Sequence, residues 1–202
     1  MKNISIIILA AGASSRMGKI KQLLPWKNGT LLSNALDTAR ASRARSIILV
    51  TGANAVQIVK NINQEGVDVV NNERWTSGMG SSIVCGMQYI KTNIPNCNGI
   101  LLMVADQPMI DITYLNELIE VFGKNQAGII ATKYNSGPGV PAVFDNKYFD
   151  ELVCLNKDYG ARDIISANLS TTICLDPAGK QKDIDTMEEY ELLIQQYSKD
   201  KK

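Results

Sequence analysis

Histidine is absent from this chain of 202 residues. The absence excludes histidine-based catalytic triads, histidine general bases and histidine metal ligands. Cysteine is scarce, and the few that occur are widely spaced and form no C-x-x-C pair. They are Cys85, Cys97, Cys154 and Cys174. This spacing predicts reduced thiols rather than a disulfide framework or a zinc site.

An excess of charge of either sign is also lacking, because the formal net charge is +1. This balance gives no sign of a nucleic-acid surface or of an acidic partner. No apolar run is long enough to span a bilayer, and the apolar N-terminal stretch has no small-residue cleavage site. We therefore expect a cytoplasmic protein that binds neither nucleic acid nor membrane.

Apolar residues make up 45% of the chain, which suffices for the core of one ordinary domain. We expect a single domain over residues 1–197 and a disordered tail over residues 198–202. Apolar strand-like runs alternate with helical patterns over residues 6–70. This β-α-β-α-β rhythm predicts a three-layer α/β sandwich on a largely parallel sheet.

The strongest functional signal lies in residues 6–25, where an apolar run predicts a buried strand that breaks into a loop of small residues. Such a loop presents backbone N–H groups to a phosphate chain. Arg16 and Lys21 add the positive charge that a triphosphate requires. The residues predicted to bind a nucleotide here are Leu9, Ala10, Ala11, Gly12, Ala13, Ser14, Arg16 and Lys21.

Two common glycine motifs do not fit this loop. The dinucleotide motif G-x-G-x-x-G fails because no glycine stands two residues after Gly12, and the P-loop fails because Gly12 and Gly18 are six residues apart. The pattern L-A-A-G-x-S-x-R-M-G-x-x-K at residues 9–21 instead resembles the signature of the MobA-like nucleotidyltransferases. Within that family it looks most like the molybdenum-cofactor cytidylyltransferases. An ordinary strand–loop–helix turn is the alternative.

A second candidate centre follows the buried strand predicted over residues 100–105. Asp106 ends this strand, at the carboxyl edge where open α/β sheets bind ligands. A carboxylate beside a triphosphate would repel it without a cation between them, so we predict that Asp106 binds Mg²⁺, with Mn²⁺ as a substitute. The tripeptide D-Q-P also matches the family. The alternative is that Asp106 caps the helix expected to begin near Asp111.

Two serines precede a helix that we expect over residues 83–90. Residues 78–86 resemble the family segment G-M-x-S-S-[LI]-x-x-G. Hydroxyl and N–H donors at a helix start can bind a ribose or a pyrimidine edge, so Ser81 and Ser82 join the predicted nucleotide site. The alternative is that both serines only cap the helix.

Residues 136–144, rich in glycine and proline, predict a stiff loop ahead of a strand. They are similar to the family segment P-G-x-P-x-x-F, which implies that Gly139 and Pro141 contact the acceptor. Many relatives have histidine in place of Val140, which puts in doubt the contact made by that histidine. A plain hairpin loop is the alternative.

Residues 157–165 resemble the family segment G-D-x-G-A-R. The resemblance places Gly160 and Arg162 near the phosphate or the pterin of the acceptor. The alternative reading is structural, with Asp158 as the N-cap of the following helix.

Residues 182–190 resemble the family's D-I-D-T-P-E-D-Y. In a short strand, Asp183 and Asp185 would point to the same face. We predict that Asp183 is the second metal ligand opposite Asp106, with Asp185 as the alternative. The T-x-x-E pattern that follows predicts a capping box for the last helix.

The resemblance implies a Rossmann-like nucleotide-diphospho-sugar transferase fold, with a mostly parallel mixed sheet in an α/β/α sandwich. It also implies that a phosphorylated acceptor attacks the α-phosphorus of a nucleoside triphosphate and that pyrophosphate leaves. Arg16, Lys21 and Asp106 would be the catalytic residues, acting by positioning and charge neutralisation. The implied substrates are CTP and a molybdopterin-type cofactor, and maturation proteins of molybdenum enzymes are the implied partners.

Ala11 carries the expected choice of base. The guanylyltransferases of the family look like L-A-G-G at this loop, whereas the cytidylyltransferases look like L-A-A-G. A methyl group narrows the space beside the base, so we predict CTP over GTP. Three alternatives stay open: another nucleotide or a sugar- or polyol-phosphate acceptor, a cofactor delivery protein without turnover, and a nicotinamide-dependent dehydrogenase, which the failed G-x-G-x-x-G disfavours.

Overall fold

A computed structural model describes residues 2–156 and 160–199 of the chain. Its centre is a seven-stranded sheet of order β5-β4-β1-β6-β8-β7-β9. Strand β8 is antiparallel to β6 and β7, whereas the other neighbours are parallel. The strands are β1 (Ile4–Leu9), β4 (Ser46–Thr51), β5 (Asp68–Asn71), β6 (Gly99–Val104), β7 (Ile129–Tyr134), β8 (Gly137–Asp145) and β9 (Thr172–Leu175). Strands β2 (Pro25–Trp26) and β3 (Gly29–Thr30) form a separate hairpin.

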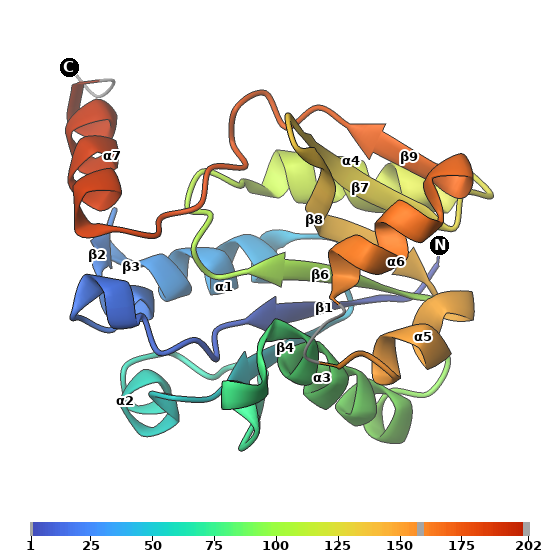
Figure 1. The fold of residues 1–202 in the computed structure, drawn as a ribbon, viewed down its shortest axis with the longest axis horizontal. Coiled ribbons are helices and arrows are strands. Elements are labelled where there is room, and N and C mark those ends of the chain that lie inside the picture. Colours follow the sequence, from blue (N-terminus) through green and yellow to red (C-terminus); the bar gives the residue numbers. More distant parts are fainter. Residues whose placement is uncertain (1, 157–159, 200–202) are drawn as a thin grey trace.

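Helices pack on both faces of the sheet, which confirms the predicted three-layer α/β/α sandwich (Figure 1). One face carries α1 (Leu31–Ala41), α2 (Ala55–Lys60) and α4 (Ile112–Lys124). The other carries α3 (Met79–Asn93), α5 (Phe149–Val153) and α6 (Ala161–Ala167). The 3₁₀ turns are η1 (Ser15–Met17), η2 (Lys21–Leu23), η3 (Trp75–Ser77), η4 (Asn146–Tyr148) and η5 (Leu169–Thr171).

Strand β1 lies in the interior of the sheet, and all of its residues are buried. Ile6 and Ile8 pack with α1 and α4, whereas Ile7 and Leu9 pack with α3 on the opposite face. Each fully buried isoleucine contributes about 1.5–3 kcal/mol of hydrophobic stabilisation. Because both faces are covered, residues 6–9 of the strand form a continuous apolar run rather than an alternating one.

The last helix, α7 (Met187–Lys199), stands at the edge of the sandwich beside the β2–β3 hairpin (Figure 1). Its Tyr190 hydroxyl donates to the carbonyl of Pro25 at 2.6 Å. A small apolar cluster around Trp26 fixes the helix there, and Ile184 and Leu193 belong to that cluster. The segment that leads into α7 is thereby held close to the loop that follows β1.

Side-chain caps fix where three helices begin. Thr30 caps α1 in a reciprocal box with Ser33, and Asp111 accepts the N–H of Tyr114 at the start of α4. Because Asp111 caps α4, the suggestion that Asp106 does so is wrong. At α7, Thr186 Oγ1 accepts from the N–H of Glu189 at 3.2 Å, and the Glu189 carboxylate accepts from the N–H of Thr186 at 3.0 Å, which confirms the predicted capping box.

Four expectations about local structure need correction. Helix α3 begins at Met79, before the predicted start, because Gly78 at φ 92° supplies the N-cap. Residues 137–145 form strand β8 instead of a loop, with a register shift opposite Ala131 and Thr132. Residues 183–185 are not a strand. The last helix continues through residues 198 and 199, where we expected a disordered tail.

Tyr114 joins helix α4 to the sheet. Its hydroxyl donates to Thr132 Oγ1 at 2.9 Å, and the carbonyl oxygen of Leu175, at 3.3 Å, is a second acceptor within reach. The Thr132 hydroxyl donates in turn to the carbonyl of Pro141 at 2.6 Å. Burial raises the pKa of the Tyr114 phenol to about 12.

We predict that Tyr114→Phe lowers the free energy of unfolding by about 1 kcal/mol at pH 7, because one buried hydrogen bond is lost. The pKa of this phenol is higher in the folded state than its unperturbed value of 10.0. The stabilisation is therefore complete below pH 10 and is lost as the pH rises towards 12, so the two proteins should converge over that range. Urea unfolding at several pH values measures the difference, and equal stabilities at pH 7 would contradict the assignment.

Candidate functional site

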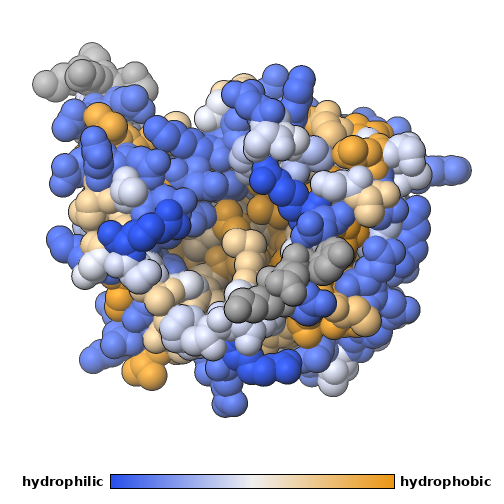
Figure 2. Space-filling view, in the orientation of Figure 1, coloured by the Kyte–Doolittle hydropathy of each residue, from blue (hydrophilic) through white to orange (hydrophobic). Residues whose placement is uncertain are grey.

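A cavity of about 430 Å³ opens at the carboxyl ends of β1 and β6. From β1 the chain runs to β4 on one side, whereas β6 neighbours the strands on the other side. Open α/β sheets bind ligands at such a switch point. Figure 2 shows a hollow near the middle of the molecular surface in this view. The cavity is lined by residues 9–17, Lys21, Gln22, Trp75, Thr76, Gly78, Met79, Ser82, Val104, Ala105, Asp106 and Asp185.

The loop after β1 is folded around the buried side chain of Gln22. Its amide nitrogen donates to the carbonyls of Ala10 and Gly12, each at 3.1 Å. Its amide oxygen accepts from the hydroxyl of Ser14 at 3.3 Å, and Ser14 Oγ accepts from the N–H of Lys21 at 3.2 Å. These bonds satisfy two carbonyl oxygens that would otherwise repel a phosphate. The loop is therefore held in shape from within.

Sequence reasoning missed Gln22. The residue follows Lys21 directly, but a single glutamine before an apolar pair carries no distinctive signal. Its role depends on a contact across the loop with residues 10–14, which only the folded loop creates.

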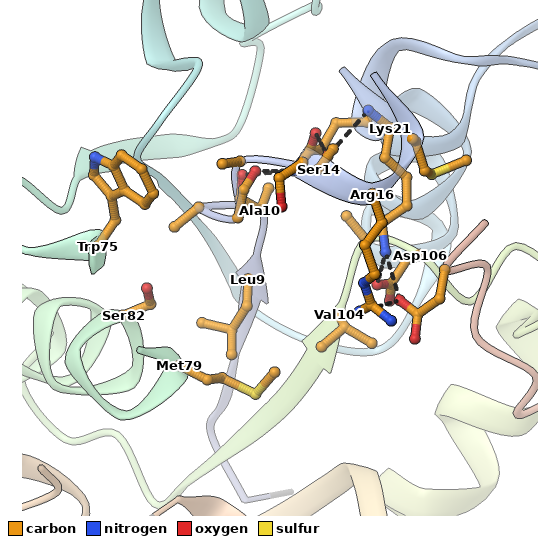
Figure 3. A pocket seen from close by; sticks show the side chains of 18 of the residues that line it. Leu9, Ala10, Ser14, Arg16, Lys21, Trp75, Met79, Ser82, Val104 and Asp106 are labelled. Carbon is orange, nitrogen blue, oxygen red and sulfur yellow. Dashed lines mark hydrogen bonds and ion pairs between the residues drawn. The ribbon is translucent and has the colours of Figure 1, made fainter. Parts of the chain in front are cut away.

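Four charged side chains meet at one end of the cavity. Lys21 Nζ lies 2.6 Å from Asp106 Oδ2 and 3.3 Å from Asp185 Oδ1. Arg16 Nη2 lies 3.5 Å from the same Asp185 oxygen. Figure 3 shows Arg16 and Lys21 extending from the loop towards Asp106. The three residues predicted to be catalytic are thus brought together, and their catalytic role stays a prediction.

The donor chemistry of this end fits a divalent cation that shares its ligands with phosphate. Asp106 Oδ1 is buried and has no hydrogen-bond partner in the structure. Among residues 2–156 and 160–199 there is no group of three or more histidine, cysteine or acidic side chains arranged to hold a metal. Mg²⁺ commonly uses only one or two carboxylates and takes its other ligands from phosphates and water. Asp106 and Asp185 supply two carboxylates.

Asp183, our first choice as the second metal ligand, lies next to this end but does not line the cavity. Its Oδ1 accepts from Gln107 Nε2 at 2.7 Å, and Gln107 also donates to the hydroxyl of Tyr134 at 2.7 Å. Burial raises the pKa of the Asp183 carboxyl. This placement favours the alternative, Asp185, as the second ligand.

Helix α3 and the turn before it form the opposite wall, where Figure 3 shows Trp75, Met79 and Ser82 across the cavity from Asp106. The amide of Asn72 donates to Ser82 Oγ at 3.0 Å and so fixes this hydroxyl. Of the two serines predicted to bind the nucleotide, Ser82 lines the cavity.

The other serine, Ser81, holds the turn that precedes α3. Its hydroxyl donates to the carbonyls of Gly78 and Arg74 at 2.8 and 2.9 Å. Neither serine is the N-cap, because that position belongs to Gly78.

Ala11 is buried beside Gly52, the residue that follows β4. A Cβ atom on Gly52 would lie 2.7 Å from the Ala11 carbonyl oxygen and 2.7 Å from Trp75 Cβ. Only glycine leaves room for Ala11 and Trp75 to approach each other here, so Gly52 shapes this wall. Sequence reasoning treated Gly52 only as the end of a strand.

The residues predicted to bind the acceptor do not line the cavity. Gly139 and Pro141 are buried in β8, and a Cβ on Gly139 would lie 3.0 Å from the ring of Tyr134. Arg162 Nη2 donates to Ser136 Oγ at 2.9 Å, which joins α6 to the β7–β8 hairpin.

Gly160, also predicted to bind the acceptor, is the N-cap of α6. Its N–H donates to Asp163 Oδ2 at 2.6 Å. Asp158, the alternative cap, lies outside the described residues. Gly160 therefore occupies the capping position at the start of the helix that carries Arg162.

Comparison with known families agrees with this geometry. Residues 6–172 match the family described as the MobA-like NTP transferase domain. The match includes the loop after β1, the wall at Trp75 and Asp106, and it ends before Asp185. The chain belongs to this family and is a nucleotidyltransferase of the MobA-like type.

Its curated relatives carry several names. The chain is 36% identical to the nicotine blue oxidoreductase of Paenarthrobacter nicotinovorans over 56% of its own length and 54% of that protein's, so the match spans about half of that relative. It is 31% identical to the molybdenum cofactor cytidylyltransferase of Escherichia coli (strain K12), over 70% of this chain and 69% of that protein. It is 28% identical to the purine catabolism protein PucB of Bacillus subtilis (strain 168), over 93% of this chain and 94% of that protein.

A solved structure, that of Rv0371c from Mycobacterium tuberculosis H37Rv, is also similar. It is 30% identical with a TM-score of 0.82, over 96% of this chain and 98% of that one. A structure of Rv0371c in complex with manganese aligns with a TM-score of 0.76 at 28% identity, over 96% and 99%. In the described part of the chain, no helix has the length and apolarity that a membrane span requires.

We predict that Gln22→Ala weakens the binding of inorganic triphosphate by about 10-fold and lowers the free energy of unfolding by about 1–3 kcal/mol. Two loop carbonyls lose their donor, and the loop loses its internal support. Calorimetric titration and urea unfolding measure the two effects. Gln57→Ala, on the exposed face of α2, is the control. Unchanged triphosphate binding in a folded Gln22→Ala protein would show that Gln22 does not shape the site.

Proposed function

We propose that this chain transfers CMP from CTP to the terminal phosphate of a molybdopterin-type cofactor and releases pyrophosphate. The observation that carries the proposal is the position of Asp106. Its carboxylate lies beside the loop after β1 and is paired with Lys21 at 2.6 Å, and its other oxygen is buried with no partner in the described part of the chain. A strand-end carboxylate against a phosphate loop suits nucleotidyl transfer to an anionic acceptor.

The proposed reaction needs positioning and charge neutralisation rather than a covalent enzyme intermediate. An oxygen of the acceptor phosphate forms a bond to the α-phosphorus of CTP, while the bond from that phosphorus to the β-phosphate oxygen breaks. The acceptor phosphate is already ionised at neutral pH, so no general base is required. Arg16 and Lys21 bind the triphosphate oxygens and stabilise the leaving pyrophosphate.

Asp106 and Asp185 would hold the divalent cation that this reaction class uses. The cation, when bound, neutralises the charge that develops on the phosphates. This chain's part is to present the two carboxylates at one end of the cavity, next to the loop that receives the phosphates. Asp183 stays a less direct candidate, since Gln107 already engages it.

Three observations support the choice of substrates. Ala11 is buried against the wall formed by Gly52 and Trp75, which suits a small base. Arg162, which is joined to Ser136 of the β7–β8 hairpin, offers a positive charge for the phosphate of the acceptor. The E. coli relative that is 31% identical carries the name of this activity.

We predict that Asp106→Asn lowers the rate of pyrophosphate release by at least about 100-fold, since a metal-binding carboxylate supplies several kcal/mol of transition-state stabilisation. The assay contains Mg²⁺ and molybdenum-loaded pterin and compares CTP, GTP, ATP and UTP. Of these four nucleotides, CTP should be the one that supports pyrophosphate release by the wild type. Asp150→Asn, at a surface aspartate paired with Lys91, is the control.

Other outcomes of this assay, of CTP binding and of a test for dye reduction would favour one of the alternative functions. Bound CTP without release indicates a different phosphorylated acceptor, and no CTP binding indicates a delivery protein without turnover. Release with GTP as fast as with CTP would overturn the proposed base. Reduction of a dye substrate with a nicotinamide nucleotide would instead favour the reaction named for the Paenarthrobacter relative.

We predict that Ala11→Gly raises the rate with GTP relative to CTP by about 10-fold, because removal of one methyl group enlarges the space beside the base. Steady-state kinetics with both nucleotides give this ratio. Ala13→Gly adds the same backbone freedom to the same loop and should leave the ratio unchanged. An unchanged ratio in Ala11→Gly would refute the role of this methyl group.

A further inference from the structure

Lys21 has an unusual position for a residue expected to bind phosphate. Its ammonium group faces two carboxylates, at 2.6 Å from Asp106 and 3.3 Å from Asp185. Only 14% of the Lys21 side chain is exposed, so solvent screens the interaction weakly. The Lys21 ammonium is therefore ion-paired with the two carboxylates and does not extend freely into the cavity.

Arg16 behaves differently from Lys21 although it extends from the same loop. Its side chain is 71% exposed, and its nearest carboxylate oxygen is 3.5 Å away. An exposed ion pair of this length contributes little. Lys21, the less exposed of the two cations, is therefore the one that mainly neutralises Asp106 and Asp185, whose side chains are 24% and 43% exposed.

The same two carboxylates are those that we assign to a divalent cation. A positive ion bound between Asp106 and Asp185 would lie next to the Lys21 ammonium and be repelled by it. The ammonium and the divalent ion therefore compete for Asp106 Oδ2. The other oxygen, Asp106 Oδ1, is buried, has no hydrogen-bond partner among the described residues and stays open to a metal ion.

We propose that Lys21 is a built-in placeholder for the divalent cation, an inference that rests on the proposed function. In the free protein the ammonium neutralises Asp106 and Asp185 and weakens their binding of a metal ion. A triphosphate on the loop after β1 offers Lys21 a different anionic partner and draws it away. The carboxylates then become free, so that nucleotide and cation bind together.

This arrangement is a thermodynamic coupling between two ligands. If the triphosphate raises the affinity for the cation by moving Lys21, the cation raises the affinity for the triphosphate by the same factor. The free protein is protected from loading a metal ion without its substrate. The coupling depends on the single positive charge at position 21, which makes it testable by substitution.

The test measures binding of Mn²⁺ to the nucleotide-free protein by electron paramagnetic resonance of the unbound ion. Lys21→Gln should bind Mn²⁺ at least about 10-fold more tightly than the wild type, because the competing charge is removed. Lys21→Arg keeps the charge and should stay close to the wild type. Lys19→Gln removes the same charge from an exposed position on the same loop and should change the affinity by less than about threefold.

Equal or weaker Mn²⁺ binding by a folded Lys21→Gln protein would overturn the proposal, as would an equal gain in Lys19→Gln. If Lys21→Gln does not fold, the wild type labelled with ¹³C at the lysine ε-carbons answers the question, with Lys21 assigned from Lys21→Arg. Inorganic triphosphate without metal should shift the Lys21 resonance, and an unshifted resonance would contradict the proposal. Neither readout requires turnover, so a failure here is distinguishable from a failure of CMP transfer.

Discussion

The ion pair between Lys21 and Asp106 joins the parts of the chain on which the site depends. Lys21 belongs to the loop after β1, Asp106 follows β6, and Asp185 comes from the segment before α7. The backbone supports the same junction, because the N–H of Ile184 donates to the carbonyl of Asp106 at 3.0 Å. These links hold the loop after β1 and the two carboxylates together at one end of the cavity.

The sheet and the last helix hold these three segments in place. Strands β1 and β6 are adjacent and parallel with a fixed register, so their carboxyl ends open at the same edge. Glu189 on α7 accepts the backbone N–H of Asp185 at 2.8 Å and so fixes the turn that presents this aspartate. The capping box of α7, which sequence reasoning assigned to structure alone, thus also orients a residue of the site.

Features encoded in short stretches could be predicted from the sequence. The apolar run of β1, the small residues after it and the aspartate after β6 each carry a local pattern that indicates its environment. Two other features depend on contacts distant in sequence. Residues 137–145 contain glycine and proline yet form a strand because β6 and β7 flank them. The role of Gln22 depends on its contacts across the folded loop, and the preference for Asp185 over Asp183 depends on the docking of the segment before α7.

We propose that Asp106 and the loop after β1 together bind a metal–nucleotide complex. A crystal structure of the chain with CTP and Mn²⁺ tests it most directly, since anomalous scattering locates the ion. We expect a manganese peak at coordination distance from Asp106 and a triphosphate on residues 12–18, with Lys21 turned from Asp106 to the phosphates. A triphosphate bound elsewhere, or a manganese ion remote from Asp106, would contradict this assignment of the metal–nucleotide site.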